Sequence, residues 1–479
     1  MALIAPWEVH TIKPAVWNHD PECGHGVACA YQTHYCTYIR VPRLLQLQDA
    51  NSPEELVHSI AFQWYELWFK VLRMDLRAAL ADRGATYESI KLLRRGIELF
   101  HLFDLQTTLN ENILIRDLKL TQTLRPPRGL RFSEQFSDLL KMARRLKSMA
   151  RGGSPELAET IQEYTAAFKS FRTRYDRLTA ATLVPSKAKV PSFVGWLRLP
   201  DLLNLQQGAK ADWAEAGQLP TRVRAPEHIS ADENMFITVH QCFELWFKVM
   251  LEHIDRAIPM LMSGDIAPAT HLLRRVVQIE RMLVQQIQVP ATMLPLDFAR
   301  FREERMERDG KTYLRGLTPA SGTESYQFRE LEIVCGLRDD PVFRRYLEGT
   351  DKLPIRLLTP RQERRLERPM LPDAFRAALR QRGIEEVRDL FTPANVPNPH
   401  ADLAELADVL VDLDEAFRFW RLGHVSMVEK MIGGKSGTGF LGPEYLMETA
   451  GIQLQEKNRI FEERQVRPRF FEELWKARG

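Results

Sequence analysis

The chain has 479 residues, of which 44% are hydrophobic and 27% charged, so it has enough apolar material for a packed core and is not a disordered or fibrous protein. Lys plus Arg number 66 and Asp plus Glu number 63, a net charge of +3, so we expect no broad basic surface for nucleic acid or anionic lipid. Five cysteines are too few for a disulfide framework, and we find neither a signal peptide nor an apolar run of about 18 residues that could span a membrane. These features predict a soluble, cytoplasmic protein.

The first feature along the chain is a group of potential metal ligands: Cys23, His25, Cys29, His34 and Cys36. Such a density of Cys and His can indicate zinc. The spacing matches no standard zinc site, however, and a metal at this place stays an open alternative.

A sequence repeat follows this group. The matched segments are 38–48 with 196–206, 66–70 with 244–248, and 92–95 with 272–275, at offsets of 158, 178 and 180 residues. The second pair reads ELWFK in both copies. Ordered matches at nearly constant offset indicate an internal duplication, with copy one at about 31–185 and copy two from about 190 onward.

The hydrophobic pattern predicts helices. Apolar residues recur every three or four positions at Phe236, Val239, Phe243 and Phe247, and Ser230 offers a cap ahead of them. The same test predicts further helices at 86–106, 134–149, 155–180, 267–288, 402–420 and 423–432. Alternating strand patterns are rare, so we expect an all-α fold.

The repeat and the composition predict the domain organisation. Residues 1–188 are expected to form a degenerate N-terminal helical half-repeat, and residues 189–479 a complete helical domain. The stretch at about 340–400 is rich in Pro and Arg and predicts a helical insert with looped connections. We expect the two copies to form a pseudo-dimer within one chain.

Phe236 and His240 are one helical turn apart, so they share a face of their helix. A histidine there can hydrogen-bond a polar edge of a ligand while the phenylalanine packs against an aromatic ring. A lone histidine is more often an ordinary core residue. Copy one, however, has His58 and Phe62 at the matching positions, so the fold does not require histidine at position 240, and this favours a functional role.

Phe298 and Arg302 form a second pair at helical spacing. A ring beside a guanidinium suits an aromatic ligand that carries a carboxylate, because arginine binds carboxylates with two hydrogen bonds. The alternative is a surface arginine over an apolar stripe. Farther along, Ser321 and Gly322 lie in a loop of small residues that leads into a helix, where the backbone can approach a ligand closely.

His424 lies on an apolar helical segment and is a candidate proximal ligand of haem iron. The glycine-rich run at 433–439 follows it. Gly437, Gly439 and Gly442 have the spacing of a dinucleotide site, but a helix and not a strand precedes them, and a P-loop would need a glycine where Glu429 stands, so the context excludes both nucleotide sites.

Taken in order, these blocks resemble the tryptophan 2,3-dioxygenase family. The family pattern F-x-x-x-H-Q-x-x-E-L-W-F-K stands at 236–248, and an aromatic-x-x-x-Arg element stands at 298–302. The family's P-A-S-G followed by Q-F-R stands at 319–329. A helical segment that begins with a histidine stands at 424–429, and G-T-G stands at 437–439. The resemblance covers most of 190–450 and implies the family's helical bundle.

The resemblance implies haem b as cofactor, with His424 as the proximal iron ligand and His240 as the catalytic residue that hydrogen-bonds the ring nitrogen of the substrate. It implies the following substrate contacts: Phe236 and Phe298 to the aromatic ring, Arg302 to the carboxylate, Thr438 to the amino-acid end, and Ser321 and Gly322 near the bound oxygen. The implied reaction of tryptophan catabolism uses O2 to cleave the indole C2–C3 bond of L-tryptophan or a substituted tryptophan, giving an N-formylkynurenine-type product.

The sequence departs from the family pattern at two places. Family members commonly have Phe-Gln where this chain has Thr323 and Glu324, and a second glycine where it has Phe440. These changes leave open whether the substrate is L-tryptophan or a substituted tryptophan. One alternative is a haem-dependent mono-oxygenase that hydroxylates an aromatic amino-acid derivative in secondary metabolism, and another is a haem-binding or scaffold protein without catalysis.

In the family, an N-terminal arm of one subunit covers the active site of its neighbour. Copy one's version of this arm contains Tyr35, Tyr38 and Ile39, and copy two's contains Phe193 and Trp196. We expect copy one's arm to cover the copy-two pocket within the same chain; the alternative is that copy one is only a packing partner. Copy one has no counterpart of His424, so it should bind no haem. By analogy with the family's tetramer, we expect a homodimer.

Overall fold

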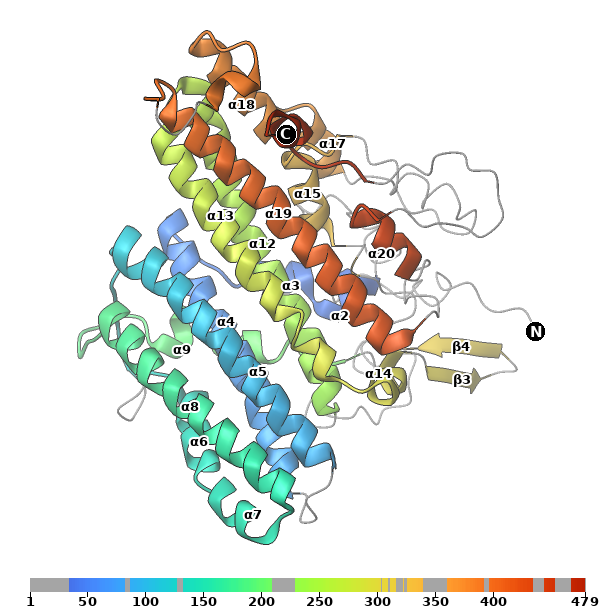
Figure 1. Cartoon of the computed structure of the whole chain (residues 1–479). Helices are drawn as coiled ribbons and strands as arrows, with labels where there is room; N and C mark the ends of the chain where they lie inside the picture. The colour runs from blue at the N-terminus through green and yellow to red at the C-terminus, as the bar shows by residue number, and fades with distance from the viewer. Residues whose placement is uncertain are drawn as a thin grey trace. The chain divides into compact units, whose positions relative to one another are not determined.

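The structure is a computed structural model, and it describes residues 34–81, 87–126, 132–208, 229–302, 304–308, 311–315, 322, 325–338, 360–391, 396–433, 443–452 and 467–478. Helices make up most of this part of the chain (Figure 1). The strands among these residues form two small sheets: β1 (Gln122–Leu124) pairs in parallel with β2 (Leu183–Pro185), and β3 (Glu304–Arg308) pairs antiparallel with β4 (Lys311–Arg315). The predicted all-α fold is confirmed.

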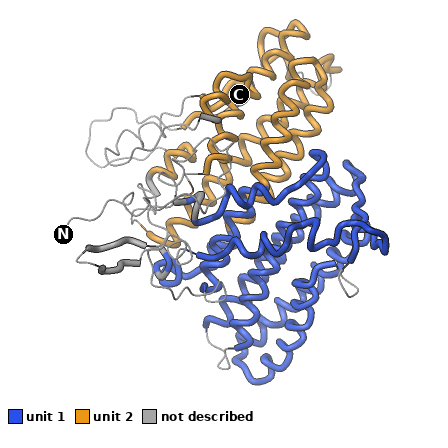
Figure 2. Tube along the Cα trace, turned by 180° about the vertical axis from the view of Figure 1, so that it is seen from behind, with its two compact units in different colours: residues 1–18, 35–245, 288–318 blue, residues 19–34, 246–287, 319–479 orange. Residues whose placement is uncertain are grey.

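The chain divides into two compact units (Figure 2). After residue 34, unit 1 comprises residues 35–245 and 288–318, and unit 2 comprises residues 246–287 and 319–479. Helix α12 (Ala231–Ser263) begins in unit 1 and continues into unit 2. The units are defined by contacts and the predicted copies by sequence, so the predicted boundary between residues 188 and 189 stays a prediction.

Unit 1 contains most of the helices of the N-terminal half. Before α12 these are α2 (His34–Ile39), α3 (Val41–Leu45), α4 (Pro53–Ala81), α5 (Tyr87–Asn110), the π-helix η5 (Glu111–Asp117), α6 (Glu134–Ala143), α7 (Leu146–Gly152), α8 (Pro155–Thr182), α9 (Phe193–Trp196) and α10 (Leu199–Leu203). After α12, the 3₁₀ turn η7 (Pro290–Thr292) and α14 (Pro295–Arg302) also belong to unit 1. The segment predicted as one helix at 134–149 is two helices, α6 and α7, because the chain turns at Arg144 and Arg145.

The core of unit 1 is aromatic. Helix α5 packs against α4 and α8, and α6 packs against α4 (Figure 1). Tyr65 of α4, Phe103 of α5 and Phe171 of α8 are fully buried, and the Phe103 and Phe171 ring centroids are 4.7 Å apart. Gly96 allows α5 to approach α8 this closely, because a Cβ atom there would lie 2.3 Å from Cε2 of Tyr164.

Unit 2 is built on the long helices α13 (Ile266–Gln286) and α19 (Ala401–Ile432), which pack side by side (Figure 1). Its other helices are α15 (Tyr326–Val334), α17 (Pro360–Leu366), α18 (Leu371–Gln381), the 3₁₀ turn η9 (Val387–Leu390), α20 (Pro443–Thr449) and α21 (Glu472–Ala477). Helix α19 is continuous where the sequence predicted two segments. Gly423, near the predicted break, costs a helix only about 1 kcal/mol, and packing against α13 outweighs this.

Matching features recur at the two places that the sequence repeat relates. Arg40 (φ 62°, ψ 35°) precedes α3 and Arg198 (φ 51°, ψ 43°) precedes α10, and both have the left-handed backbone that is uncommon for arginine. Ser52 and Ser230 each accept a hydrogen bond from the backbone N–H three residues later, at 3.1 Å and 3.0 Å, at the start of α4 and α12. These parallels support the predicted duplication.

A reciprocal pair of hydrogen bonds joins the two predicted copies inside unit 1. The Gln63 side chain of α4 donates to the carbonyl oxygen of Leu197 (3.1 Å), and the Gln241 side chain of α12 donates to that of Ile39 (2.9 Å). Residues 39 and 197 are 158 positions apart, which is the offset of the arms in the repeat. Each helix therefore binds the arm of the other copy.

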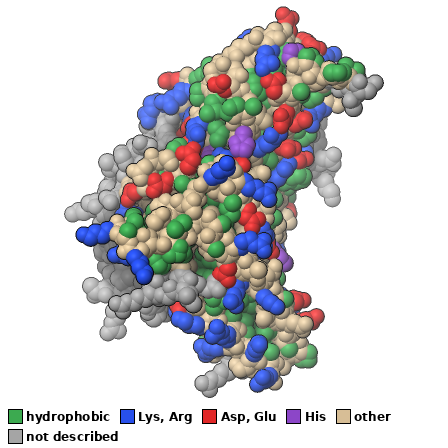
Figure 3. All heavy atoms as spheres, turned by 90° about the vertical axis from the view of Figure 1, so that its left-hand side faces the viewer, with side chains coloured by type: hydrophobic (Ala, Val, Ile, Leu, Met, Phe, Trp, Pro, Cys, Tyr) green, Lys and Arg blue, Asp and Glu red, His purple; other side chains and the backbone are tan. Residues whose placement is uncertain are grey.

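The surface carries both signs of charge. Lys and Arg side chains lie among Asp and Glu side chains over much of the face seen in Figure 3. No helix among the described residues is both long enough and apolar enough to cross a membrane.

Candidate active site

Helix α12 presents Phe236 and His240 on one face in unit 1, as predicted. Their ring centroids are 4.5 Å apart, and both side chains are half-buried. The His240 Nδ1 lies 2.7 Å from the Phe236 carbonyl oxygen. The two residues therefore form one rigid pair in the first turns of the helix.

The hydrogen bond to Phe236 determines the tautomer of His240. A carbonyl oxygen only accepts, so Nδ1 carries the proton. Burial lowers the pKa of His240 to about 4, against a smaller opposing effect of the backbone of Phe236, and the imidazole is therefore neutral at pH 7. Its Nε2 is then an unprotonated acceptor that can bind the ring N–H of a ligand.

Helix α14 supplies a second aromatic element. The Phe298 ring centroid lies 5.6 Å from that of Phe236, and Phe301 lies 5.5 Å from each of them. Phe298 and Phe301 are both buried. Phe301 was not predicted as a site residue, although its position three residues after Phe298 on a helix is a signal for it.

The arm of copy one packs against α12 in the same unit. The Tyr35 ring lies edge-on to His240 at 5.7 Å, and its hydroxyl donates to Oε1 of Glu244 at 2.9 Å. The Tyr38 hydroxyl donates to Oε1 of Glu233 at 3.1 Å. With the Ile39 carbonyl bound to Gln241, all three predicted arm residues contact the helix that carries His240.

Two acidic partners of the arm were missed at the sequence level. Glu244 is fully buried and belongs to the repeated ELWFK segment. A charged residue inside a buried apolar motif is a signal of a specific partner. Glu233 carried no such signal, because an acid in the first turn of a helix is ordinary.

Copy one shows the same arrangement with other side chains. The arm of copy two places Trp196 with its ring 5.2 Å from His58, and Phe193 with its ring 6.2 Å from Phe62. His58 is fully buried, and neither ring nitrogen has a hydrogen-bond partner among the described residues. Burial lowers the pKa of His58 to about 4, so this histidine is also neutral. Phe62 replaces the imidazole of His240 and leaves no acceptor there.

His424 lies on α19 in unit 2 and is half-buried. Its ring centroid is 5.2 Å from that of Trp420, which is in turn 4.8 Å from Phe328 of α15. A partly accessible imidazole on a long helix, beside large aromatic rings, suits an axial ligand of a flat apolar cofactor.

The surroundings of His424 fit a haem group in one further respect. Arg421, one turn before His424, donates from its Nη2 to Glu332 (2.9 Å). Its buried Nε–H has no acceptor among the described residues, and an acidic group of a cofactor would supply one. No group of three or more His, Cys, Asp or Glu in the described part of the chain is arranged to hold a metal ion, but a haem iron needs only one such ligand.

The remaining predicted residues are described in part or not at all. Gly322 is described and exposed, and its carbonyl oxygen accepts a hydrogen bond from the Ser325 amide (3.1 Å). Arg302 ends α14, but its side chain lies outside the described residues, as do Ser321 and Thr438. The possible zinc ligands Cys23, His25, Cys29, His34 and Cys36 also lie outside the described residues or have no described side chain.

Comparison with known proteins gives one consistent result. The family model for tryptophan 2,3-dioxygenase matches residues 216–391. A tryptophan 2,3-dioxygenase of Nocardioides sp. is 38% identical over 264 residues, which cover 52% of this chain and 92% of that protein. Those of Herpetosiphon aurantiacus and Caulobacter vibrioides are each 32% identical, covering 60% and 52% of this chain and 97% and 89% of the relatives.

These relatives are dioxygenases, and the matches span nearly their full length. The chain belongs to the tryptophan 2,3-dioxygenase family. Its helical fold agrees with this membership. The alignments leave about half of the chain unmatched, and the additional length is consistent with the extra half-repeat that the sequence predicts.

Proposed function

We propose that the protein is a haem-dependent dioxygenase that cleaves the indole C2–C3 bond of L-tryptophan or a substituted tryptophan with O2, giving an N-formylkynurenine-type product. Membership of the family supports this reaction. The observation that carries the proposal is the neutral His240, held by the Phe236 carbonyl oxygen with its Nε2 free of a proton, beside the rings of Phe236 and Phe298.

The side chains of unit 1 would bind and orient the substrate. The indole ring packs against Phe236 and Phe298, and its N–H donates to Nε2 of His240. This hydrogen bond fixes the ring and raises the electron density along the C2–C3 bond, which makes that bond easier to oxidise. Arg302, at the end of the helix that carries Phe298, would bind the substrate carboxylate through two hydrogen bonds.

The cofactor residues complete the proposal. His424 would ligate the iron of haem b, and the bound haem would supply the O2 chemistry that no protein side chain can perform. Thr438 would bind the amino-acid end of the substrate, and Ser321 and Gly322 would lie on the side where O2 reacts. Glu324 and Phe440, which differ from the common family residues, would adapt the pocket to a substituted ring.

Copy one would cover the pocket within the same chain. The contacts of Tyr35 with His240 and Glu244, and of Tyr38 with Glu233, support this role. Copy one itself would bind no haem. Two such chains, as a cytoplasmic homodimer, would reproduce the four-fold arrangement of repeats in the family's tetramer.

Absorption spectra and turnover test the proposed function. The purified, haem-loaded protein should show a Soret band that shifts when tryptophan is added, and it should convert tryptophan to N-formylkynurenine. His424→Ala should lose the Soret band, while the control His101→Ala, whose side chain is 58% exposed, should keep it. A protein with no Soret band after haem reconstitution would contradict the proposal.

A further inference from the structure

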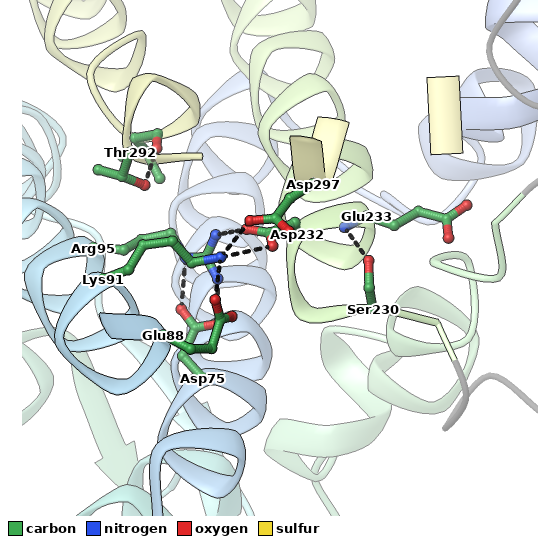
Figure 4. A network of polar contacts seen from close by, with 10 residues as sticks. Asp75, Glu88, Lys91, Arg95, Ser230, Asp232, Glu233, Thr292 and Asp297 are labelled. Atoms are coloured by element: carbon green, nitrogen blue, oxygen red, sulfur yellow. Dashed lines mark hydrogen bonds and ion pairs between the residues drawn. The ribbon is translucent and has the colours of Figure 1, made fainter. Parts of the chain in front are cut away.

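A buried network of charged side chains joins helices α4, α5, α12 and α14 in unit 1 (Figure 4). Lys91 of α5 lies at its centre: Nζ is 2.7 Å from Oδ2 of Asp297 and 3.1 Å from Oδ2 of Asp232, and the side chain is 4% exposed. Arg95 binds both carboxylate oxygens of Asp75, at 2.8 Å and 2.6 Å, and Oδ1 of Asp232 at 2.5 Å. Asp232 thus receives one cation on each oxygen.

The charges of the network depend on one another. Two buried cations face three buried carboxylates, and the half-exposed Glu88 adds a further ion pair with Lys91 at 2.9 Å. Burial alone would lower the pKa of Lys91, but the ion pairs with Asp297 and Asp232 outweigh it and raise the pKa above its usual range. Lys91 is therefore charged, and removing its charge leaves Asp232 and Asp297 in a buried site with an excess of negative charge.

Both acids stand at the starts of the helices that form the aromatic site. Asp297 lies in the first turn of α14 and directly precedes Phe298. Asp232 lies in the first turn of α12, one turn before Phe236. The Phe236 and Phe298 ring centroids are 5.6 Å apart. One ammonium group therefore ties together the two helix starts from which these rings project.

The copy-one part of this network is not repeated in copy two. At the positions that match Lys91 and Asp75, copy two has His271 and His253. In unit 2, His271 forms a hydrogen bond with Arg275 (3.0 Å), so copy two has different chemistry at these places. Copy one thus supplies the two cations of this network, Lys91 and Arg95, in addition to its arm.

We propose that Lys91 is a positioning residue for the substrate: by binding Asp232 and Asp297 together, it sets the separation of α12 and α14 and hence the relative placement of the Phe236 and Phe298 rings, against which the aromatic ring of the substrate packs. The pocket assignment rests on the proposed function, whereas the effect on the two helices does not. Because Lys91 acts through Asp232 and Asp297, its loss should affect substrate binding more than the chemical step.

The test uses the full haem-loaded chain and the variants Lys91→Met, Lys91→Arg and, as a matched control, Lys141→Met, whose side chain is 74% exposed. Lys91→Met should raise the KM for tryptophan about fivefold or more and change kcat less than twofold, with the substrate-free Soret band unchanged. Hydrogen exchange of residues 295–302 should become faster in Lys91→Met, while that of α6 stays the same. Lys91→Arg should recover most of both effects, and Lys141→Met should match the wild type.

Unchanged KM and unchanged exchange at 295–302 in Lys91→Met would overturn the proposal. So would a loss of kcat, haem and thermal stability together that Lys91→Arg does not restore, because that pattern indicates a general structural role. If Lys91→Met does not fold, Asp297→Asn is tested in its place, and the KM for tryptophan and the hydrogen exchange at 295–302 are measured in the same way. A wild-type chain that turns over neither tryptophan nor a ring-substituted tryptophan contradicts the proposed function, and exchange at 295–302 still decides the role of Lys91.

Discussion

The hydrogen bond between His240 and the Phe236 carbonyl oxygen decides what this imidazole can do. The helical spacing of the two residues in the sequence was enough to predict that they share a face. It did not give the tautomer, because that depends on the 2.7 Å contact of Nδ1 with a carbonyl oxygen and on the burial of the ring. Lys91 was also missed, because its partners Asp232 and Asp297 are far away in the sequence.

His240 should support activity over a wide pH range. Its pKa is lowered to about 4, so the ring gains a proton only as the pH falls toward 4. Protonation of His240 should therefore not lower kcat/KM between pH 6 and 9.

His240→Phe introduces the residue that copy one has at this place. It should lower kcat/KM for tryptophan about tenfold or more through loss of one hydrogen bond. A tryptophan methylated on the indole nitrogen has no N–H to donate, so the wild type and the variant should bind it alike. If kcat/KM of the wild type fell as the pH was lowered through 6.5, while that of His240→Phe did not, His240 would be an ordinary, solvated histidine.

At the scale of elements, the periodic apolar pattern predicted most long helices well. The helices expected at 86–106 and 155–180 correspond to α5 and α8. The pattern failed where packing decides the outcome, as at Gly423, across which α19 continues. The short arm helices α2 and α9 have too few residues for a periodic signal, and only the repeat drew attention to them.

The two arms allow a matched test of the covering role. Tyr38→Ala removes a hydroxyl that binds Glu233 on the helix of His240, so it should raise the KM for tryptophan severalfold with a smaller effect on kcat. Trp196→Ala removes the matching arm residue, which packs on His58 of copy one, and it should leave KM unchanged. Steady-state kinetics of both variants check this prediction. Equal KM values for Tyr38→Ala and the wild type would mean that copy one is only a packing partner.

At the scale of the whole molecule, the chain is about twice as long as the part that its relatives match, and the predicted half-repeat would account for the additional length. Its relatives align over about half of it and over nearly all of their own length. The sequence predicted the family, which the relatives confirm, and the helical fold, which the structure confirms. The compact units could not be predicted from it, because α12 runs through both and contacts, not sequence similarity, define them.

The duplication predicts one haem per chain. Copy one has Phe62 where copy two has His240, and it has no counterpart of His424. Haem extraction and iron analysis should give one haem for each 55.5 kDa chain, and light scattering should give a mass of two chains. Two haems per chain would show that copy one is a second active domain.

Product analysis under labelled O2 tests the central claim most directly. The haem-loaded protein is incubated with L-tryptophan and a set of ring-substituted tryptophans under ¹⁸O₂, and the products are identified by mass spectrometry. Cleavage of the indole C2–C3 bond by dioxygenation predicts a product that carries both labelled oxygen atoms. A product with one labelled atom and an intact indole ring would identify a mono-oxygenase and contradict the account.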